Sequence, residues 1–405
     1  MFKGKSLKKP QLSFSLLHKI FVAASIRRWN DQATPVEFLE LDKQAHKFVI
    51  AYFLAHFEEI KNKQKIDWEL LILQFCYEFF ERIILTDIKP PVFHKLVKNH
   101  NKELVDFVCL ELQEDLKNFP FFENMRSYLY GEVNNIEKQI LKASHYYASK
   151  WEFDIIYHFN PNMFDVQNIK NIIDKQVEEH YHLAGIVEIV LYQEIREIIG
   201  MFGQLRFQKR WSQTPRVPAT SVLGHTLVVA LCALLLGYDL KCCKQMQINH
   251  FLCGLFHDLP EILTRDIISP IKRSVKGLDS FIKQIEEEEV KEKILTKVPK
   301  PIQEDIVYFT KEEFSNRYKK DGKIMILPKG EEILRDFNED SYSPVFGEFL
   351  KYCDHLSAFL EAKISIGHGI SSKDLQEGAK NLEYQYNDKA INGIDLGYLF
   401  REFKS

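Results

Sequence analysis

Four short matches between the two halves of the chain constrain its architecture more than any other feature. SIRRWNDQ near residue 28 matches FQKRWSQT near 210, and AHKFVIAYFLAHFEE from residue 45 matches GHTLVVALCALLLGY from residue 224. CYEFFERIILTDIKPPV from 76 aligns without gaps with FHDLPEILTRDIISPIK from 256, and LKASHYYASKWE from 141 matches LKYCDHLSAFLE from 350. Because the pairs keep one order and similar spacing, we interpret them as an ancient duplication with a boundary near 185–200. We therefore expect two tandem domains, 1–190 and 191–405.

Helical periodicity dominates both halves. The chain has 17 glycines and 14 prolines among 405 residues, so it is poor in the residues that break helices. A short strand is predicted at Lys323–Leu327 after Asp321-Gly322, within a polar insertion near 303–343. The predicted fold class is all-α, with two tandem helical domains and this small mixed insertion. Apolar residues recur at helical spacing in 44–59, 68–84, 177–201, 221–236, 248–256 and 346–366.

Charge, hydropathy and cysteine usage exclude several classes of protein. A net charge of −3 gives no basic excess of the kind that binds a nucleic-acid polymer. The longest clean apolar run, 227–236, is too short to span a membrane. The basic and then apolar N-terminus resembles a signal peptide, but His18 and Lys19 interrupt the apolar part. The seven cysteines include no C-x-x-C pair, so we predict reduced thiols in a cytoplasmic protein that uses no membrane.

The residues with the clearest chemistry lie in the second half. His257-Asp258 ends an apolar segment, and Pro260 disfavours helical backbone at the residue before it, so both side chains would point into one place. His225 lies 32 residues upstream and Asp354 far downstream, each on its own apolar helix. A lone HD dipeptide is common and carries little weight. In this context, however, an unpaired charge on each apolar helix would be costly, which favours a shared partner.

A divalent cation is the partner that these residue types suit. If the four side chains converge, two neutral imidazoles and two carboxylates would surround the cation with no net charge left over. Such mixed nitrogen and oxygen ligation suits Mn²⁺, Fe²⁺, Co²⁺, Ni²⁺ or Zn²⁺. A metal of this kind lowers the pKa of bound water and creates a nucleophile at neutral pH.

The order H…HD…D resembles that of the HD superfamily of metal-dependent phosphohydrolases. The string HDLPEILTRDIISPIK, with an Arg-Trp fifteen residues before the first histidine, is similar to the bacterial 5′-deoxynucleotidase branch. The resemblance is close over 206–290 and looser over 345–365. It implies four metal ligands, namely His225, His257, Asp258 and Asp354.

The resemblance also implies roles in catalysis and substrate binding. Glu261 matches the acidic residue that assists catalysis, and Arg210 matches the residue that orients the phosphate. Trp211 and Asp266 match positions that shape a deoxyribose site. Gly224 departs from the pattern, since family members often carry an acidic residue there. The implied substrate contacts are Arg210, Trp211, His225, Asp258, Asp266, Ile267, Ile268, Ser269 and Asp354.

Each assignment has an ordinary structural alternative. Glu261 could be an exposed first-turn glutamate, and Arg210 could pair with a surface carboxylate. Trp211 could belong to the core, which is the usual fate of tryptophan. Asp266 could cap the next helix.

The duplication makes the first half interpretable as a degenerate copy. Its Arg28-Trp29 keeps the Arg-Trp pair, and His46 and Glu81 take the places of His225 and Glu261. Tyr77-Glu78, Thr86 and His145 replace His257-Asp258, Asp266 and Asp354. Tyrosine is a poor ligand at neutral pH because its pKa is near 10. We predict that this half keeps the helical fold without the metal, as a structural partner that mimics a dimer mate in a monomer. A regulatory nucleotide pocket using Arg28 is the alternative.

These observations predict an enzyme that acts on nucleotides. The leading hypothesis is a metal-dependent phosphohydrolase that removes phosphate from deoxyribonucleoside 5′-monophosphates by attack of metal-bound water. The protein could also be a phosphodiesterase or a deoxynucleotide triphosphohydrolase, because the four metal ligands do not determine which substrate is hydrolysed. The competing class is a nucleotide-binding regulatory protein with weak or no hydrolysis.

Overall fold

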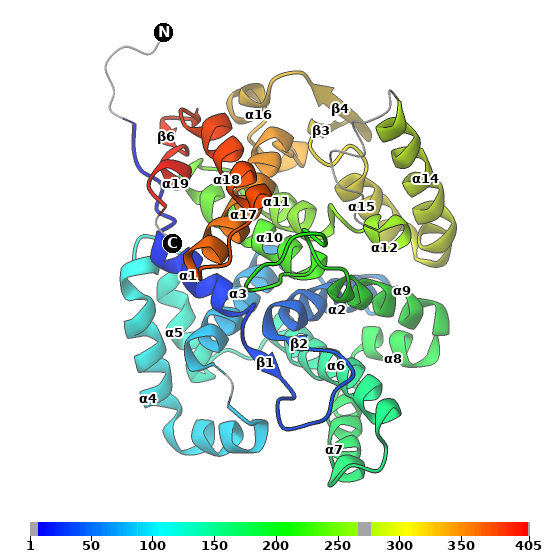
Figure 1. Cartoon of the computed structure of the whole chain (residues 1–405). Helices are drawn as coiled ribbons and strands as arrows, with labels where there is room; N and C mark the ends of the chain where they lie inside the picture. Colours follow the sequence, from blue (N-terminus) through cyan, green and yellow to red (C-terminus); the bar gives the residue numbers. More distant parts are fainter. Residues whose placement is uncertain (1–6, 87, 266–276, 404–405) are drawn as a thin grey trace. The chain divides into compact units, whose positions relative to one another are not determined.

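The chain divides into two compact units, which we describe separately. The computed structural model describes residues 7–86, 88–265 and 277–403 (Figure 1). The N-terminal unit comprises residues 19–204 and 296–303, and the C-terminal unit comprises 1–18, 205–295 and 304–405. The predicted domain limits, 1–190 and 191–405, stay a prediction.

The N-terminal unit is built around α2 (Glu40–Lys61), which is buried along almost its whole length. α2 contacts α6 (Ile136–Phe159), α8 (Ala184–Leu191) and α9 (Gln193–Gln204). Side chains cap the first turns of α3 (Trp68–Leu85) and α6. Asp67 accepts a hydrogen bond from the amide of Leu70, and Asn135 accepts one from the amide of Lys138. The other elements that involve this unit are α1 (Phe14–Val22), β1 (Arg27–Arg28), β2 (Phe38–Leu39), α3 (Trp68–Leu85), α4 (Pro90–Leu116), α5 (Phe122–Tyr130), α6 (Ile136–Phe159), α7 (Val166–Glu178), α8 (Ala184–Leu191) and α9 (Gln193–Gln204).

The C-terminal unit is built around α10 (Val222–Asp239), which contacts α11 (Lys244–Phe256) and α17 (Gly347–Gly367) (Figure 1). In the described residues its strands form two antiparallel pairs, β3–β4 and β5–β6, and the N-terminal unit has a third such pair, β1–β2. From residue 205 onward the remaining elements are η1 (Leu205–Phe207), α12 (Glu261–Thr264), α14 (Leu278–Lys293), η2 (Leu295–Lys297), α15 (Lys300–Thr310), β3 (Asn316–Lys320), β4 (Lys323–Leu327), α16 (Gly330–Asp336), η3 (Asp340–Tyr342), α18 (Lys373–Tyr386), β5 (Ala390–Ile391), β6 (Ile394–Asp395) and α19 (Tyr398–Arg401).

α10 is the central helix of the C-terminal unit because its sequence is apolar on every face. Ser221 caps it by accepting a hydrogen bond from the amide of Gly224 at 2.9 Å. Residues Val222–Leu240 are long and apolar enough to cross a membrane, but 94% of that window is buried inside the protein. This burial is typical of a core helix.

α10 and α11 approach each other closely at Gly254. A methyl group at this position would lie 2.8 Å from both the Cα and the backbone nitrogen of Ala230. Only glycine allows this separation, and the close approach holds the end of α11 against the first half of α10.

The all-α prediction is confirmed, and most of the predicted helices match observed ones. The strand at Lys323–Leu327 is also confirmed as β4, joined to β3 by Asp321-Gly322. Both turn residues have positive φ angles, of 50° and 72°, which suit a tight hairpin. The insertion near 303–343 contains this hairpin and α16, although its first residues continue α15.

The helical spacing of apolar residues over 177–201 does not correspond to one continuous helix. α7 ends at Glu178, and α8 and α9 follow as separate helices. The backbone is extended at Leu183 and again at Tyr192, which ends the helical hydrogen bonding on either side of α8. α8 packs against α2 so closely that a methyl group on Gly185 would lie 2.6 Å from Leu54 Cα. Tertiary packing therefore overrides the helical periodicity here.

Candidate metal centre

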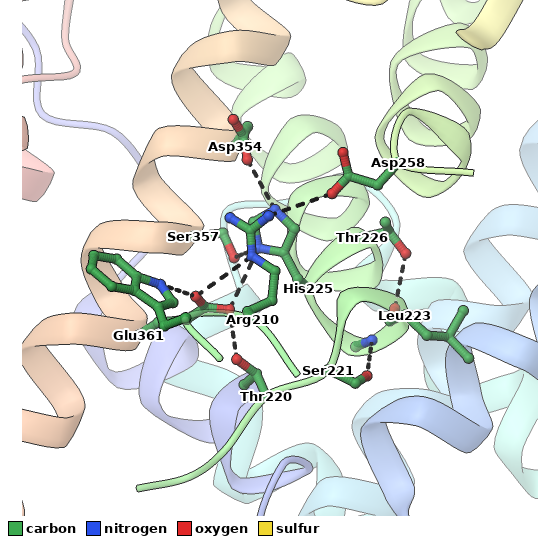
Figure 2. A network of polar contacts seen from close by, with 12 residues as sticks. Arg210, Thr220, Ser221, Leu223, His225, Thr226, Asp258, Asp354, Ser357 and Glu361 are labelled. Atoms are coloured by element: carbon green, nitrogen blue, oxygen red, sulfur yellow. Dashed lines mark hydrogen bonds and ion pairs between the residues drawn. The ribbon is translucent and has the colours of Figure 1, made fainter. Parts of the chain in front are cut away.

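His225 reaches the site from the first turn of α10. It is fully buried, and its Nε2 lies 2.9 Å from Asp354 Oδ1 on α17 (Figure 2). Its Nδ1 lies 2.9 Å from the hydroxyl oxygen of Ser357. Burial and the nearby Arg210 lower the pKa of His225, but hydrogen bonds with Asp354 and Glu361 outweigh them and raise it. The packing of α10 against α17 therefore brings His225 and Asp354 together, although they are far apart in the sequence.

His257 and Asp258 lie at the end of α11, as the sequence predicted. His257 Nδ1 lies 2.8 Å from the carbonyl oxygen of Gly254. A carbonyl only accepts, so Nδ1 carries the proton and Nε2 of the neutral ring has a free lone pair. Nε2 is 3.3 Å from Asp258 Oδ1, and the rings of His257 and His225 lie 5.8 Å apart.

The residues fit a divalent cation. Candidate ligand atoms of His225, His257 and Asp258 lie within 4.8 Å of one another, and Asp354 joins them through His225. Within the described part of the chain, His257 Nε2 and Asp258 Oδ2 are buried and make no hydrogen bond. Buried polar atoms of this kind are rare unless a ligand, water or ion satisfies them. The donor set of imidazole nitrogens and carboxylate oxygens suits a first-row transition metal.

Arg210 lies beside this cluster. Its NH1 is 3.6 Å from Asp258 Oδ2, and its backbone amide donates to the carbonyl of Thr220 at 3.1 Å. Burial lowers the pKa of Arg210, but the nearby charges of Glu361 and Asp258 outweigh this effect and raise the pKa above its usual value. The guanidinium therefore stays charged. Burial likewise raises the pKa of Asp354, but the hydrogen bond with His225 lowers it well below its usual range.

Glu261 lies in the first turn of α12 and lines a cavity of about 260 Å³ together with His257 and Asp258. Glu261 is 8% exposed, so the alternative of an exposed glutamate is wrong. Its backbone carbonyl accepts from the side-chain amide of Gln208 at 3.1 Å. The rest of the cavity wall comes from α14, α15 and the segments after them, with side chains that include Ile282, Lys283, Glu286, Glu287, Lys291, Lys311, Glu312 and Glu313.

Trp211 is partly buried and has a positive φ of 54°. Its indole Nε1 donates to Glu361 Oε2 at 3.0 Å, and its ring lies against Gly378 on α18. The predicted substrate residues Asp266, Ile267, Ile268 and Ser269 lie outside the described residues. The structure therefore brings together His225, His257, Asp258, Asp354, Arg210 and Glu261, while their roles stay predictions.

Sequence reasoning missed Glu361, a buried carboxylate that accepts from Trp211 and from the Thr220 hydroxyl. A signal for it was present, because the fourth repeat match ends in glutamate in both copies, at Glu152 and Glu361. Ser357, the hydrogen-bond partner of His225, was also missed. Serine on an apolar helix gives no comparable signal.

The corresponding side chains of the N-terminal unit make different contacts. Lys47 forms an ion pair with Glu78, and the ammonium group of Lys43 lies 2.6 Å from His145 Nδ1. Tyr77 donates to the carbonyl of Phe121 at 3.1 Å.

The Arg-Trp pair of the N-terminal unit repeats the contacts of its counterpart. Arg28 Nε and Trp29 Nε1 both donate to Glu152 Oε2 at 2.8 Å. Trp29 also has a positive φ, of 56°.

Comparisons with known proteins agree with this geometry. The family model of the HD domain matches residues 202–383, a range that contains Arg210 and all four candidate ligands. No curated protein matches the chain. HD domains typically bind divalent metals and act in general as phosphohydrolases. The match and the cluster together support membership of the HD-domain superfamily for residues 202–383.

Proposed function

We propose that the C-terminal unit hydrolyses nucleotides in a metal-dependent reaction, and that its substrates are deoxyribonucleoside 5′-monophosphates. The observation that carries the proposal is the cluster of His225, His257 and Asp258, whose ligand atoms lie within 4.8 Å of one another. Asp354 completes the set through His225, and Arg210 lies 3.6 Å from Asp258. A cation site with a charged guanidinium beside it is suited to a phosphate group.

The four candidate ligands would hold the cation, which supplies a water nucleophile of lowered pKa. Arg210 would bind and orient the phosphate, a task for which its planar and permanently charged fork is suited. Hydrolysis forms a bond from the water oxygen to phosphorus and breaks the ester bond to the sugar oxygen. Glu261 would give a proton to that leaving oxygen, because it lines the same cavity.

The cavity beside the cluster supports a small substrate. A volume of about 260 Å³ is just below the range of about 300–1,000 Å³ that is typical of small-molecule sites. Its described wall includes Lys283, Lys291 and Lys311, of which Lys283 pairs with Glu313 and Lys311 pairs with Glu287. With two of these three cations already paired, the wall suits a substrate with one phosphate better than a triphosphate.

A substrate panel tests this proposal. Purified protein with Mn²⁺ or Co²⁺ is offered mono-, tri- and cyclic nucleotides in ribo and deoxy forms, and phosphate release is measured. We expect release from deoxyribonucleoside monophosphates and its loss in Asp258→Ala. Hydrolysis that survives this substitution would contradict the site. Micromolar nucleotide binding without turnover would instead favour the nucleotide-binding regulatory protein.

We further propose that the N-terminal unit is a degenerate copy of the same fold that holds no metal. The equivalent contacts of Trp29 with Glu152 and of Trp211 with Glu361 support common ancestry. The ammonium group of Lys47 beside Glu78 supports the loss of metal, since a buried cation already neutralises this carboxylate. A structural role agrees with this arrangement better than a nucleotide pocket does, because Arg28 forms closer ion pairs, at 2.9 Å with Glu40 and 2.8 Å with Glu152, than Arg210 does with its own carboxylates.

The monomeric state and the cytoplasmic location belong to the same proposal. Two related units in one chain would replace the two copies of a dimer, which light scattering of the full chain can check. All seven cysteines are free in the described ranges, and reduced thiols agree with a cytoplasmic location.

A further inference from the structure

We propose that Glu361 is a positioning residue that orients Arg210 and Trp211 with one carboxylate oxygen and His225 with the other. This inference rests on the proposed phosphohydrolase function, for which Arg210 and His225 are the phosphate-binding and metal-binding groups. Glu361 itself is not proposed to touch the metal or the substrate.

Glu361 lies seven residues after Asp354 on α17, so the two carboxylates lie on the same face of the helix, two turns apart. Glu361 is 2% exposed. Figure 2 shows its carboxylate between Thr220, Arg210 and the ring of His225. Its position therefore links the segment before α10 to α10 itself.

The two oxygens of Glu361 contact different groups. Oε2 accepts from the indole of Trp211 at 3.0 Å and lies 4.0 Å from Arg210 Nε. Oε1 accepts from the hydroxyl of Thr220 at 2.7 Å and lies 3.5 Å from His225 Nδ1. Oε2 therefore faces Trp211 and Arg210, and Oε1 faces His225.

Glu361 is a buried carboxylate that lies beside two guanidinium groups, those of Arg210 and Arg216. Arg216 NH1 lies 3.7 Å from Oε2, and its NH2 donates to the Thr220 hydroxyl at 2.9 Å. A buried anion is a strong orienting group for the cations and N–H donors around it.

This anion has a direct consequence for the metal ligand. His225 Nδ1 lies 2.9 Å from the Ser357 hydroxyl oxygen and 3.5 Å from Glu361 Oε1. When the Nδ1–H faces these two acceptors, Nε2 is left as the donor atom for a cation. Partners of this kind fix the tautomer and the ring orientation of a ligand histidine and increase its basicity. Loss of such a partner typically reduces metal affinity by about 10–100-fold.

The N-terminal unit provides a matched control in the same chain. Glu152 is fully buried and accepts from Trp29 and Arg28, as Glu361 does from Trp211. The histidine of that unit is oriented differently, since His46 Nε2 lies 3.0 Å from the carbonyl of Ile199. Glu152→Gln therefore removes an equivalent buried charge without altering the proposed metal ligand.

The test compares E361Q with E152Q in the full chain. Mn²⁺ alone is titrated calorimetrically, and inorganic phosphate is then titrated into the Mn²⁺-loaded protein. We expect both variants to have a lower Tm. Only E361Q should weaken Mn²⁺ binding, by about 10–100-fold, and phosphate binding with it. E152Q should stay within about twofold of wild type for both probes.

Two results would overturn the inference, namely unchanged Mn²⁺ affinity in E361Q or an equal loss in E152Q. Should E361Q fail to fold, T220V replaces it, because this change removes the hydroxyl that holds Oε1. It should weaken Mn²⁺ binding several-fold, and unchanged affinity would again overturn the inference. Failure of the proposed function is a separate result, since it requires wild-type protein that binds no Mn²⁺ or releases no phosphate from any nucleotide.

Discussion

His225 Nε2 lies 2.9 Å from Asp354 Oδ1, although 129 residues separate the two in the sequence. The contact exists because α10 and α17 pack side by side and present these residues on facing surfaces. His257 and Asp258 reach the same place from the end of α11. The proposed chemistry therefore depends on the packing of α10, α11 and α17. Substitutions of the site residues and of the residues at the helix contacts can both test it.

Glu261→Gln separates catalysis from metal binding. We expect kcat for phosphate release to fall by about 100-fold or more, because the amide cannot give a proton to the leaving oxygen. Mn²⁺ affinity, measured by calorimetry, should stay near that of wild type. Glu312→Gln is the control, since Glu312 lines the same cavity and has no proposed role in the reaction. Full activity in Glu261→Gln would remove Glu261 from the mechanism.

Gly254→Ala tests the packing that supports the site. The added methyl group would lie 2.8 Å from the backbone of Ala230, so α10 and α11 would have to separate. Overpacking of this kind costs about 1–3 kcal/mol, and thermal unfolding should show a Tm lower by about 5 °C.

Gly237→Ala is the matched control on α10. A methyl group there would meet its nearest neighbours, Gln247 Cγ and Cys242 Sγ, at 3.7 and 3.9 Å, which is ordinary contact. Its Tm should be unchanged or higher, because alanine favours helices over glycine. Equal effects of the two substitutions would contradict a specific close contact at Gly254.

Much of this architecture could be predicted from the sequence, because local patterns determine it. The apolar sequence of α10 predicts a buried helix, and Asp321-Gly322 predicts the hairpin turn. His257-Asp258 could be recognised as a site because an adjacent imidazole and carboxylate at the end of an apolar segment need a partner. The family match over residues 202–383 supports the predicted resemblance to the HD-domain superfamily.

Other features depend on tertiary contacts and could not be predicted in this way. The break between α7 and α8 follows from the close packing of Gly185 on Leu54, which periodicity does not encode. The role of Glu361 follows from its distances to Thr220 and His225, and these come from packing between separate elements. The paired lysines of the N-terminal unit were missed because Lys43 and Lys47 would ordinarily be assigned to a solvated helix face.

His250 makes stability sensitive to acid. Its Nε2 accepts from the amide of Phe346 at 3.0 Å, and burial, with a smaller effect of the Arg317 charge, lowers the pKa of His250 to about 3. At His250 the unfolded chain gains a proton below about pH 6.5 and the folded chain does not, so the contribution of His250 to stability is constant above that pH and falls as the pH drops toward 3.

Urea denaturation at pH 7.5 and pH 5 measures this effect. Wild type should lose about 2 kcal/mol more than His250→Gln over this interval, from about 1.4 kcal/mol for each pH unit below 6.5. Glutamine can still accept from Phe346, which keeps the variant comparable. An identical pH dependence in both proteins would show that folding does not lower the pKa of His250.

The central claim is that one divalent cation binds per chain, at His225, His257, Asp258 and Asp354. Calorimetric titration of the full chain with Mn²⁺ measures this directly, with Asp258→Asn and Glu78→Gln as matched variants in the two units. We predict one ion per chain in wild type and in Glu78→Gln, and loss of binding in Asp258→Asn. Two ions per chain, or unchanged binding in Asp258→Asn, would contradict the account.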